Sequence, residues 1–200
     1  RAGQAGHRVN AALLCLTLAG GVTGRHAMLY TIDSTRSVIG FSVRRMAVST
    51  LRGRFTVVTG LVRQDDADPT HGAVDVVIRT ASLDTDDKDR DRRLRGNDFL
   101  ESRKYAEIRF VSRRIERAGD HLVAIGDLTV RGVTREVRVP YTITTSATIG
   151  LGAIAITGST KISRKDFDLM WRPNPDLANL FVGDQVTIEL NLVATGGHPG

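Results

Sequence analysis

The feature that most constrains the fold is the alternation of apolar and polar residues in one segment of the chain after another. Ile39, Phe41 and Val43 share one face of an extended segment, and Val76 and Ile78 do the same further on. A period of two residues is typical of a strand with one buried face and one solvated face. Because many segments repeat this pattern, the sequence predicts an all-β fold built on antiparallel pairing.

The length and composition fit one such domain. The chain has 200 residues, of which 41% are hydrophobic and 25% are charged, as in soluble globular proteins. Aromatic residues make up 5%, so the interior is expected to be mostly aliphatic. Cys15 is the single cysteine, which excludes a disulfide within the chain, and the five histidines are not spaced as metal ligands. We therefore expect no metal site.

The first part of the chain differs in character from the rest. A basic pair, His7 and Arg8, precedes the short apolar run VNAALLCLTLAG, and small residues follow. This order is typical of a secretory signal, and the run is too short to span a bilayer as a helix. The sequence predicts a leader over residues 1–27, one domain over 28–195 and a disordered tail over 196–200. The leader predicts export to the periplasm, the cell envelope or the medium, with a cytoplasmic location as the alternative.

The alternation stops in a charged segment, residues 83–103. Asp84 or Thr85 can cap a helix there, acidic residues fall in its first turns, arginines follow, and Gly96 can end it. We expect a short charged helix that covers one end of the sheet. Charges of both signs within a few residues largely cancel each other's field, which argues against a nucleic-acid surface here.

A second charged segment, residues 162–171, interrupts two alternating runs near the end of the chain. Arg164 and Asp166 lie there beside two large aromatic residues, Phe167 and Trp171. Charges next to apolar surface at a strand end suit the mouth of a cavity whose ligand has one polar end. The alternative is that the aromatic residues plug the end of an ordinary core while the charges lie in water.

Pro140 lies inside another alternating run, residues 135–145. Proline has no N–H to donate to a neighbouring strand, so it predicts a sheet edge, a bulge or a seam at this position. An exposed edge would also allow two chains to pair, which leaves a homodimer open.

The net charge of +6 suits nucleic acid or an anionic lipid surface equally well. Four of the 28 basic residues are lysine, and an arginine bias of this size is also what a GC-rich coding sequence produces. The few aromatic residues on the predicted wet faces count against a stacking platform for single-stranded nucleic acid. The charge alone therefore does not identify a partner.

The motifs of the common enzyme classes do not occur in the sequence. There is no G-x-S-x-G, no P-loop, no dinucleotide-binding fingerprint and no H-E-x-x-H. The acidic residues of the segment 84–91 lie among arginines and fit surface ion pairs better than a general acid–base pair. The segment 65–69 is typical of a turn. The sequence predicts no catalytic residue, no metal and no cofactor.

Several short motifs occur in an order that is specific as a set. They are Tyr30-Thr-Ile-Asp33, Ser37-Val-Ile-Gly-Phe41, Met46 to Phe55, Arg90 to Leu94 with Asp98-Phe-Leu, Ile108-Arg-Phe110, Gly126 to Thr134, Ile162 to Trp171 and Val182-Gly-Asp184. On these motifs the chain resembles the YceI-like family, also called polyisoprenoid-binding proteins. The resemblance implies an extended, lipocalin-like antiparallel β-barrel of about eight strands with one short charged helix over an end. It also implies an interior that holds a long isoprenoid or a similar amphiphile.

The inward positions of the predicted strands would line the interior of such a barrel. They are Ile39, Phe41, Phe55, Val57, Val76, Ile78, Ile108, Phe110, Leu128, Val139, Ile156, Ile188 and Leu190, with Phe167 and Trp171 at the mouth. Arg164, Asp166 and Arg44 near the open end would meet a phosphate, quinone or amide head group.

The function predicted on this basis is non-enzymatic binding, storage or transport of a polyisoprenoid or similar long-chain lipid. The expected partner is the lipid itself, with transient contact to a membrane surface and no nucleic acid. Two alternatives stay open: a basic β-barrel that binds nucleic acid, and an enzyme or accessory of isoprenoid chemistry, for which no nucleophile or base is visible.

Overall fold

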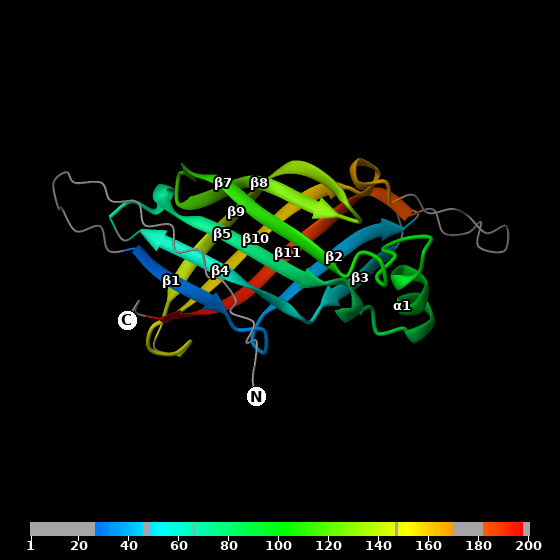
Figure 1. The fold of residues 1–200 in the computed structure, drawn as a ribbon, viewed down its shortest axis with the longest axis horizontal. Coiled ribbons are helices and arrows are strands. Elements are labelled where there is room, and N and C mark those ends of the chain that lie inside the picture. Colours follow the sequence, from blue (N-terminus) through cyan, green and yellow to red (C-terminus); the bar gives the residue numbers. More distant parts are fainter. Residues whose placement is uncertain (1–26, 46–48, 66, 147, 170–181, 198–200) are drawn as a thin grey trace, which may run out of the picture.

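The computed structural model describes residues 27–45, 49–65, 67–146, 148–169 and 182–197. In these ranges the chain is mostly β-strand, with one α-helix (Figure 1). The strands are β1 (Ala27–Ile32), β2 (Val38–Arg45), β3 (Ser49–Phe55), β4 (Val58–Asp65), β5 (Ala73–Arg79), β6 (Leu83–Asp84), β7 (Glu107–Ala118), β8 (His121–Val130), β9 (Val133–Thr145), β10 (Ala153–Ser163) and β11 (Val182–Gly197). The helix is α1 (Lys88–Arg95), and the short 3-10 turns are η1 (Pro69–His71), η2 (Thr80–Ser82) and η3 (Arg164–Phe167).

The predicted leader lies outside the described residues, except that Ala27 is the first residue of β1. In the part of the chain that the structure describes, no helix is long and apolar enough to cross a bilayer.

Eight of the strands close into an antiparallel barrel. Their order is β1-β4-β5-β7-β8-β9-β10-β11, and the pairing of β1 with β11 completes the ring. The predicted barrel of about eight strands is therefore confirmed. Gly196 and Gly197 belong to β11 and pair with Tyr30 and Leu29, so β11 extends two residues into the segment that was predicted to be a disordered tail.

Three strands of the barrel are interrupted along the chain. After a break β1 is followed by β2 and β5 by β6, and β3 precedes β4. β2 lies along β11 next to β1, β3 pairs with β2, and β6 pairs with β3. These three strands lengthen the barrel towards the end where α1 lies (Figure 1). The eight segments of the sequence pattern therefore correspond to eight barrel strands, three of which are interrupted.

The break between β3 and β4 overturns one prediction. The sequence alternation carries the inward face from Phe55 through Val57 to Leu61, but β3 ends at Phe55 and β4 begins at Val58. The phase slips by one residue, so Val58 is 0% exposed while Val57 is 41% exposed. The backbone N–H of Val57 donates to Ser82 Oγ over 3.1 Å, which holds the break in place. The prediction that Val57 faces the interior is wrong.

Helix α1 lies at the predicted end of the barrel but begins later than predicted. Its N-cap is Asp87, whose carboxylate accepts the N–H groups of Asp89 and Arg90, and Gly96 follows its last residue. Leu94 packs into the hydrophobic core. The helix therefore buries its one apolar residue against the barrel, together with Asp91, and leaves most of its other charges in solvent.

The segment before α1 is held by a buried carboxylate rather than by a cap. Asp91 Oδ1 accepts hydrogen bonds from the backbone N–H of Thr85 over 2.9 Å and from its hydroxyl over 2.7 Å. Both residues are 6% exposed. The prediction that Thr85 or Asp84 caps the helix is thus corrected, since Asp87 is the cap and Thr85 is bonded to Asp91.

Replacing Asp91 with alanine is expected to lower the free energy of unfolding by about 2 kcal/mol, because two buried donors of Thr85 would lose their acceptor. Urea titration of the purified protein would measure the loss. Asp89→Ala is the matched control: Asp89 is exposed and pairs with an exposed arginine, so its loss is expected to change stability by less than about 0.5 kcal/mol. Equal losses in the two variants would contradict the assignment.

Candidate functional site

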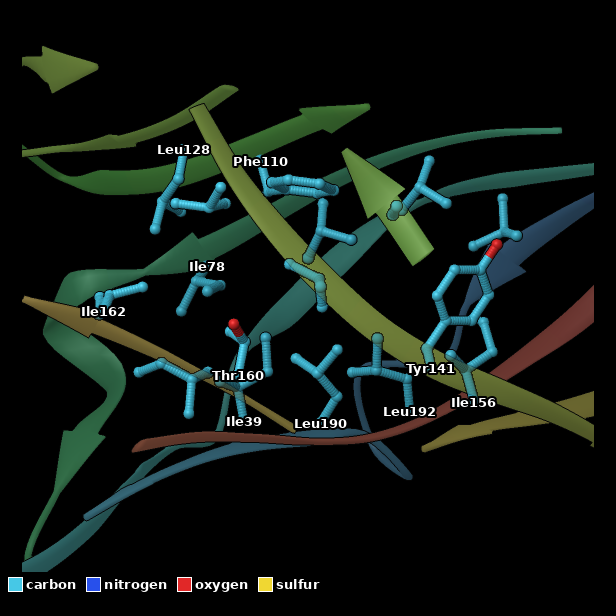
Figure 2. Close-up of a pocket in the computed structure, with 17 residues that line it drawn as sticks. Ile39, Ile78, Phe110, Leu128, Tyr141, Ile156, Thr160, Ile162, Leu190 and Leu192 are labelled. Atoms are coloured by element: carbon cyan, nitrogen blue, oxygen red, sulfur yellow. The ribbon is translucent and has the colours of Figure 1, made fainter. Parts of the chain in front are cut away.

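An apolar cavity occupies the interior of the barrel. Its volume is about 90 Å³, counted over the positions that the centre of a water molecule can take. The surface that faces it is apolar, and the described residues that line it include no charged side chain. Figure 2 shows Ile162 and Leu128 towards one end of the cavity and Tyr141 and Leu192 towards the other. The site is therefore a neutral, hydrophobic space inside the barrel.

The residue types in the wall explain why space remains. The lining comes mostly from valine, isoleucine and leucine, and among the described lining residues the aromatic ones are Phe110 and Tyr141. An eight-stranded barrel is just wide enough for side chains to fill it or for one small ligand to lie inside. Medium-sized aliphatic side chains leave room that larger ones would occupy.

Two hydroxyl groups lie in this wall, and neither carries charge. Thr160 Oγ1 donates a hydrogen bond of 2.8 Å to the backbone carbonyl of Arg138. Tyr141 is 7% exposed, and burial raises the pKa of its phenol to about 12. Tyr141 therefore stays protonated and neutral throughout the physiological pH range.

Many of the residues predicted to face the interior do line this cavity. They are Ile39, Val76, Ile78, Phe110, Leu128, Val139, Ile156, Ile188 and Leu190. Phe55, Ile108 and Phe167 are buried in the hydrophobic core instead, and Phe41 packs against Phe55 with 5.6 Å between ring centroids. Trp171 lies outside the described residues.

Other lining residues were not among the candidates. They are Val62, Val74, Ala124, Val137, Tyr141, Thr160, Ile162 and Leu192. Half of these, Val74, Val137, Tyr141 and Leu192, lie two positions from a predicted inward residue and in phase with it, so the alternation could have included them. Val62 was missed because the phase slips before β4, and Ala124 because it is small.

Arg164, the first choice for a head-group ligand, is engaged by the protein itself. Its Nε donates to the carbonyl of Gly183 over 3.2 Å, and its Nη1 to the carbonyl of Leu169 over 2.9 Å. Its Nη2 bonds Asp184 Oδ1 over 2.9 Å, and the side chain is 13% exposed. Arg164 therefore joins η3 to the start of β11.

Asp184 is shared by two cations of η3. Lys165 Nζ lies 2.6 Å from Asp184 Oδ2, and the hydrogen bond from Lys165 holds the pKa of the Asp184 carboxyl below its usual value. The carboxylate therefore stays ionised and keeps η3 bound to β11 at neutral pH.

The other two head-group candidates, Asp166 and Arg44, are exposed. Asp166, on η3, lines a second pocket, which is formed by β9, β10 and η3. Arg44, on β2, is absent from the described lining of both pockets. The backbone carbonyl of Arg44 lies beside Gly183, whose own carbonyl accepts from Arg164, so these two candidates are neighbours at the start of β11.

Comparison with known proteins supports this architecture. A model of the YceI-like domain matches residues 30–194. A UPF0312 protein of Photorhabdus laumondii subsp. laumondii is 37% identical over 110 residues, which make up 54% of this chain and 57% of that protein. The match to this relative thus spans little more than half of its length.

Two solved structures share the fold. BcnA of Burkholderia cenocepacia superposes with a TM-score of 0.72 at 27% identity, covering 82% of this chain and 99% of that one. A polyisoprenoid binding domain from Saccharophagus degradans superposes with a TM-score of 0.67 at 19% identity, covering 84% and 98%. The second likeness shows the fold alone. Since the family match covers residues 30–194, the chain belongs to the YceI-like family.

Proposed function

We propose that this barrel binds one long-chain lipid, of the polyisoprenoid kind, with the tail in its interior cavity. The observation that carries the proposal is the cavity itself, which is apolar and free of charged side chains among its described lining. The polyisoprenoid binding domain of Saccharophagus degradans, which has the same fold, supports this ligand class.

The energetics favour a long tail over a short one. Burying a methylene group gains about 0.8 kcal/mol, while association costs on the order of 4–15 kcal/mol in lost translational and rotational freedom. A single isoprene unit cannot offset that cost, but several units in one cavity can. A carrier of this type therefore needs no covalent step.

The wall supports binding rather than catalysis. The hydroxyl of Thr160 is engaged with a backbone carbonyl, and the phenol of Tyr141 stays protonated because its pKa is about 12. The described lining holds no carboxylate, imidazole, thiol or amine that could act as a base or a nucleophile. We propose storage or transport as the role.

The outer face of the barrel gives little support to the nucleic-acid alternative. Many strand arginines there are paired with carboxylates, which weakens their attraction for a phosphate backbone. The pairs are Arg54 with Asp84, Arg79 with Glu107, Arg109 with Asp75, Arg113 with Asp127 and Arg138 with Glu116.

Lipid extraction tests the proposal directly. Organic extracts of the purified full-length protein are expected to contain a long-chain lipid at close to one molecule per barrel, as measured by mass spectrometry. After delipidation, the protein should bind prenols with an affinity that rises with each isoprene unit until the cavity is filled, as measured by calorimetry. An extract without any long-chain molecule, together with no prenol binding, would sink the proposal.

The leader makes an exported location part of the proposal, since a lipid carrier of this type would serve the cell envelope. N-terminal sequencing of the protein from its native host is expected to show a mature chain that begins near Met28. A chain that keeps residues 1–27 would count against export.

A further inference from the structure

The barrel wall is incomplete between β9 and β10. Residues 141–145 of β9 pair with residues 154–158 of β10, and the pairing stops there although both strands continue. Beyond that point β9 stays paired with β8, and β10 stays paired with β11, to the ends of both strands. We call the unpaired stretch, residues 133–140 of β9 facing residues 159–163 of β10, the seam.

Specific residues at its start explain the seam. A Cβ atom on Gly158 would overlap the carbonyl oxygen of Pro140, so that carbonyl points towards β10. The N–H and C=O of one strand residue point to the same side, so the missing N–H of Pro140 also faces β10. Next to it, the hydroxyl of Thr160 donates a hydrogen bond of 2.8 Å to the backbone carbonyl of Arg138. A side-chain hydrogen bond thus stands where the ladder would continue.

The seam leads from the cavity to an outer pocket. The outer pocket lies on β9 and β10 beside η3 and has a volume of about 390 Å³ by the same measure as the cavity. Val137, Thr160 and Ile162 line both spaces. An amphiphile can therefore keep its tail in the barrel cavity and its head group in the outer pocket.

The outer pocket is polar, and some of its charges are already neutralised. The charged side chains that line it are Arg135, Glu136, Arg138, Lys161 and Asp166. Arg138 is held by Glu116 over 3.0 Å, and Glu136 lies 3.5 Å from Arg113. These two charges have partners within the protein.

Two cations of the outer pocket have no carboxylate partner in the described part of the chain. Lys161 and Arg135 are exposed, and no ion pair of either occurs there; an Arg135 N–H donates to the carbonyl of Thr134. Asp166 opposes them with one negative charge. An ammonium and a guanidinium beside an apolar opening are the donors that phosphate and carboxylate oxygens prefer.

We propose that the seam is a lateral portal, at which Lys161 and Arg135 hold the anionic head group, phosphate or carboxylate, of a lipid whose tail lies in the cavity. This inference rests on the proposed function. The part of the wall that lacks ladder hydrogen bonds is also the part that separates at the lowest cost, so the tail enters the cavity there.

Paired ligands with the same tail test the head-group site. A prenol with four isoprene units and its monophosphate are titrated into the delipidated protein in a calorimeter at low salt. The phosphate is expected to bind about tenfold more tightly than the alcohol. Lys161→Gln and Arg135→Gln should each reduce that preference about threefold, the double variant should remove it, and Asp166→Asn should increase it. The alcohol should bind all variants equally.

Lys165→Gln is the matched control, because Lys165 is exposed on η3, pairs with Asp184 and does not line the outer pocket. It should leave the preference unchanged. If neither ligand binds, the proposed function itself fails. If both bind with equal affinity in the wild type, or if the preference survives the double variant, lipid binding stands and the head-group site is overturned.

A photoreactive group next to the phosphate tests the lateral route. Labelled peptides are expected from residues 133–140 and 159–166, on the two sides of the seam. Labelling centred on residues 58–65 and 73–79, on β4 and β5 across the ring from the seam, would overturn the portal.

Discussion

Gly126→Ala is expected to lower the free energy of unfolding by about 3 kcal/mol or more. Gly126 lies on β8 opposite Ser112 of β7, where the register of the pair shifts at a bulge. A Cβ atom there would overlap the carbonyl oxygen of Val111 and come within 2.6 Å of Ser112 Cα. Both are backbone atoms, so a whole strand would have to move. Urea titration of the purified variant would measure the loss.

The control for this prediction is Gly40→Ala on β2. A Cβ on Gly40 would meet its nearest atoms, both in the side chain of Glu189, at 3.6 Å, which is ordinary van der Waals contact. The stability of the Gly40→Ala protein is expected to equal or exceed that of the wild type. Alanine lowers the conformational entropy of the unfolded chain relative to glycine, so less entropy is lost on folding. A Gly126→Ala protein as stable as Gly40→Ala would show that the bulge tolerates a side chain.

The strands themselves were predictable, because alternation records which face of a segment is buried, and burial acts on each strand locally. Which residues face inward after a break between two strands could not be predicted. Residues 57 and 58 are both valine, so the sequence does not show which of them faces the interior after Phe55. The choice is made by Ser82 and Arg79, which bond the backbone of Val57 across the sheet. Such partners are distant in sequence and leave no local signal.

The role of Arg164 shows the same limit at the site. A cation at a strand end beside aromatic residues suits a ligand, and the sequence predicted one. In the fold, however, Asp184 and the carbonyl of Gly183 come within hydrogen-bonding distance of its guanidinium. A guanidinium with several donors is satisfied by whichever acceptors the tertiary structure brings near, and about 20 residues of chain separate these partners.

Pro140 was informative because proline restricts pairing on one side only. The sequence allowed an edge, a bulge or a seam. β9 has a neighbour on each side, so it is not an edge, and its register with β8 runs evenly through the pair Val123 and Pro140, so it is not a bulge there. The seam is the remaining option. The sequence thus indicated where the pairing is interrupted, while the fold was needed to show which of the three options applies.

The cavity leads to the last expected result. Val76→Phe should weaken prenol binding at least about tenfold while leaving the stability of the protein equal to or above that of the wild type. Val76 lies on β5 opposite Phe110, is 6% exposed and lines the cavity away from the seam. A phenyl ring there takes the space that the tail needs, and filling an apolar void usually stabilises a core.

Val111→Phe is the matched control, because it makes the same change on the outer face of the neighbouring strand β7, where Val111 is 37% exposed. It should leave prenol affinity unchanged. Calorimetry gives the affinities, and a thermal melt of each variant shows that it is folded. If Val76→Phe is folded and binds prenol as tightly as Val111→Phe does, the tail lies elsewhere. If binding is lost in Val76→Phe alone, the lipid and the ring compete for the same space, which places the tail inside the barrel.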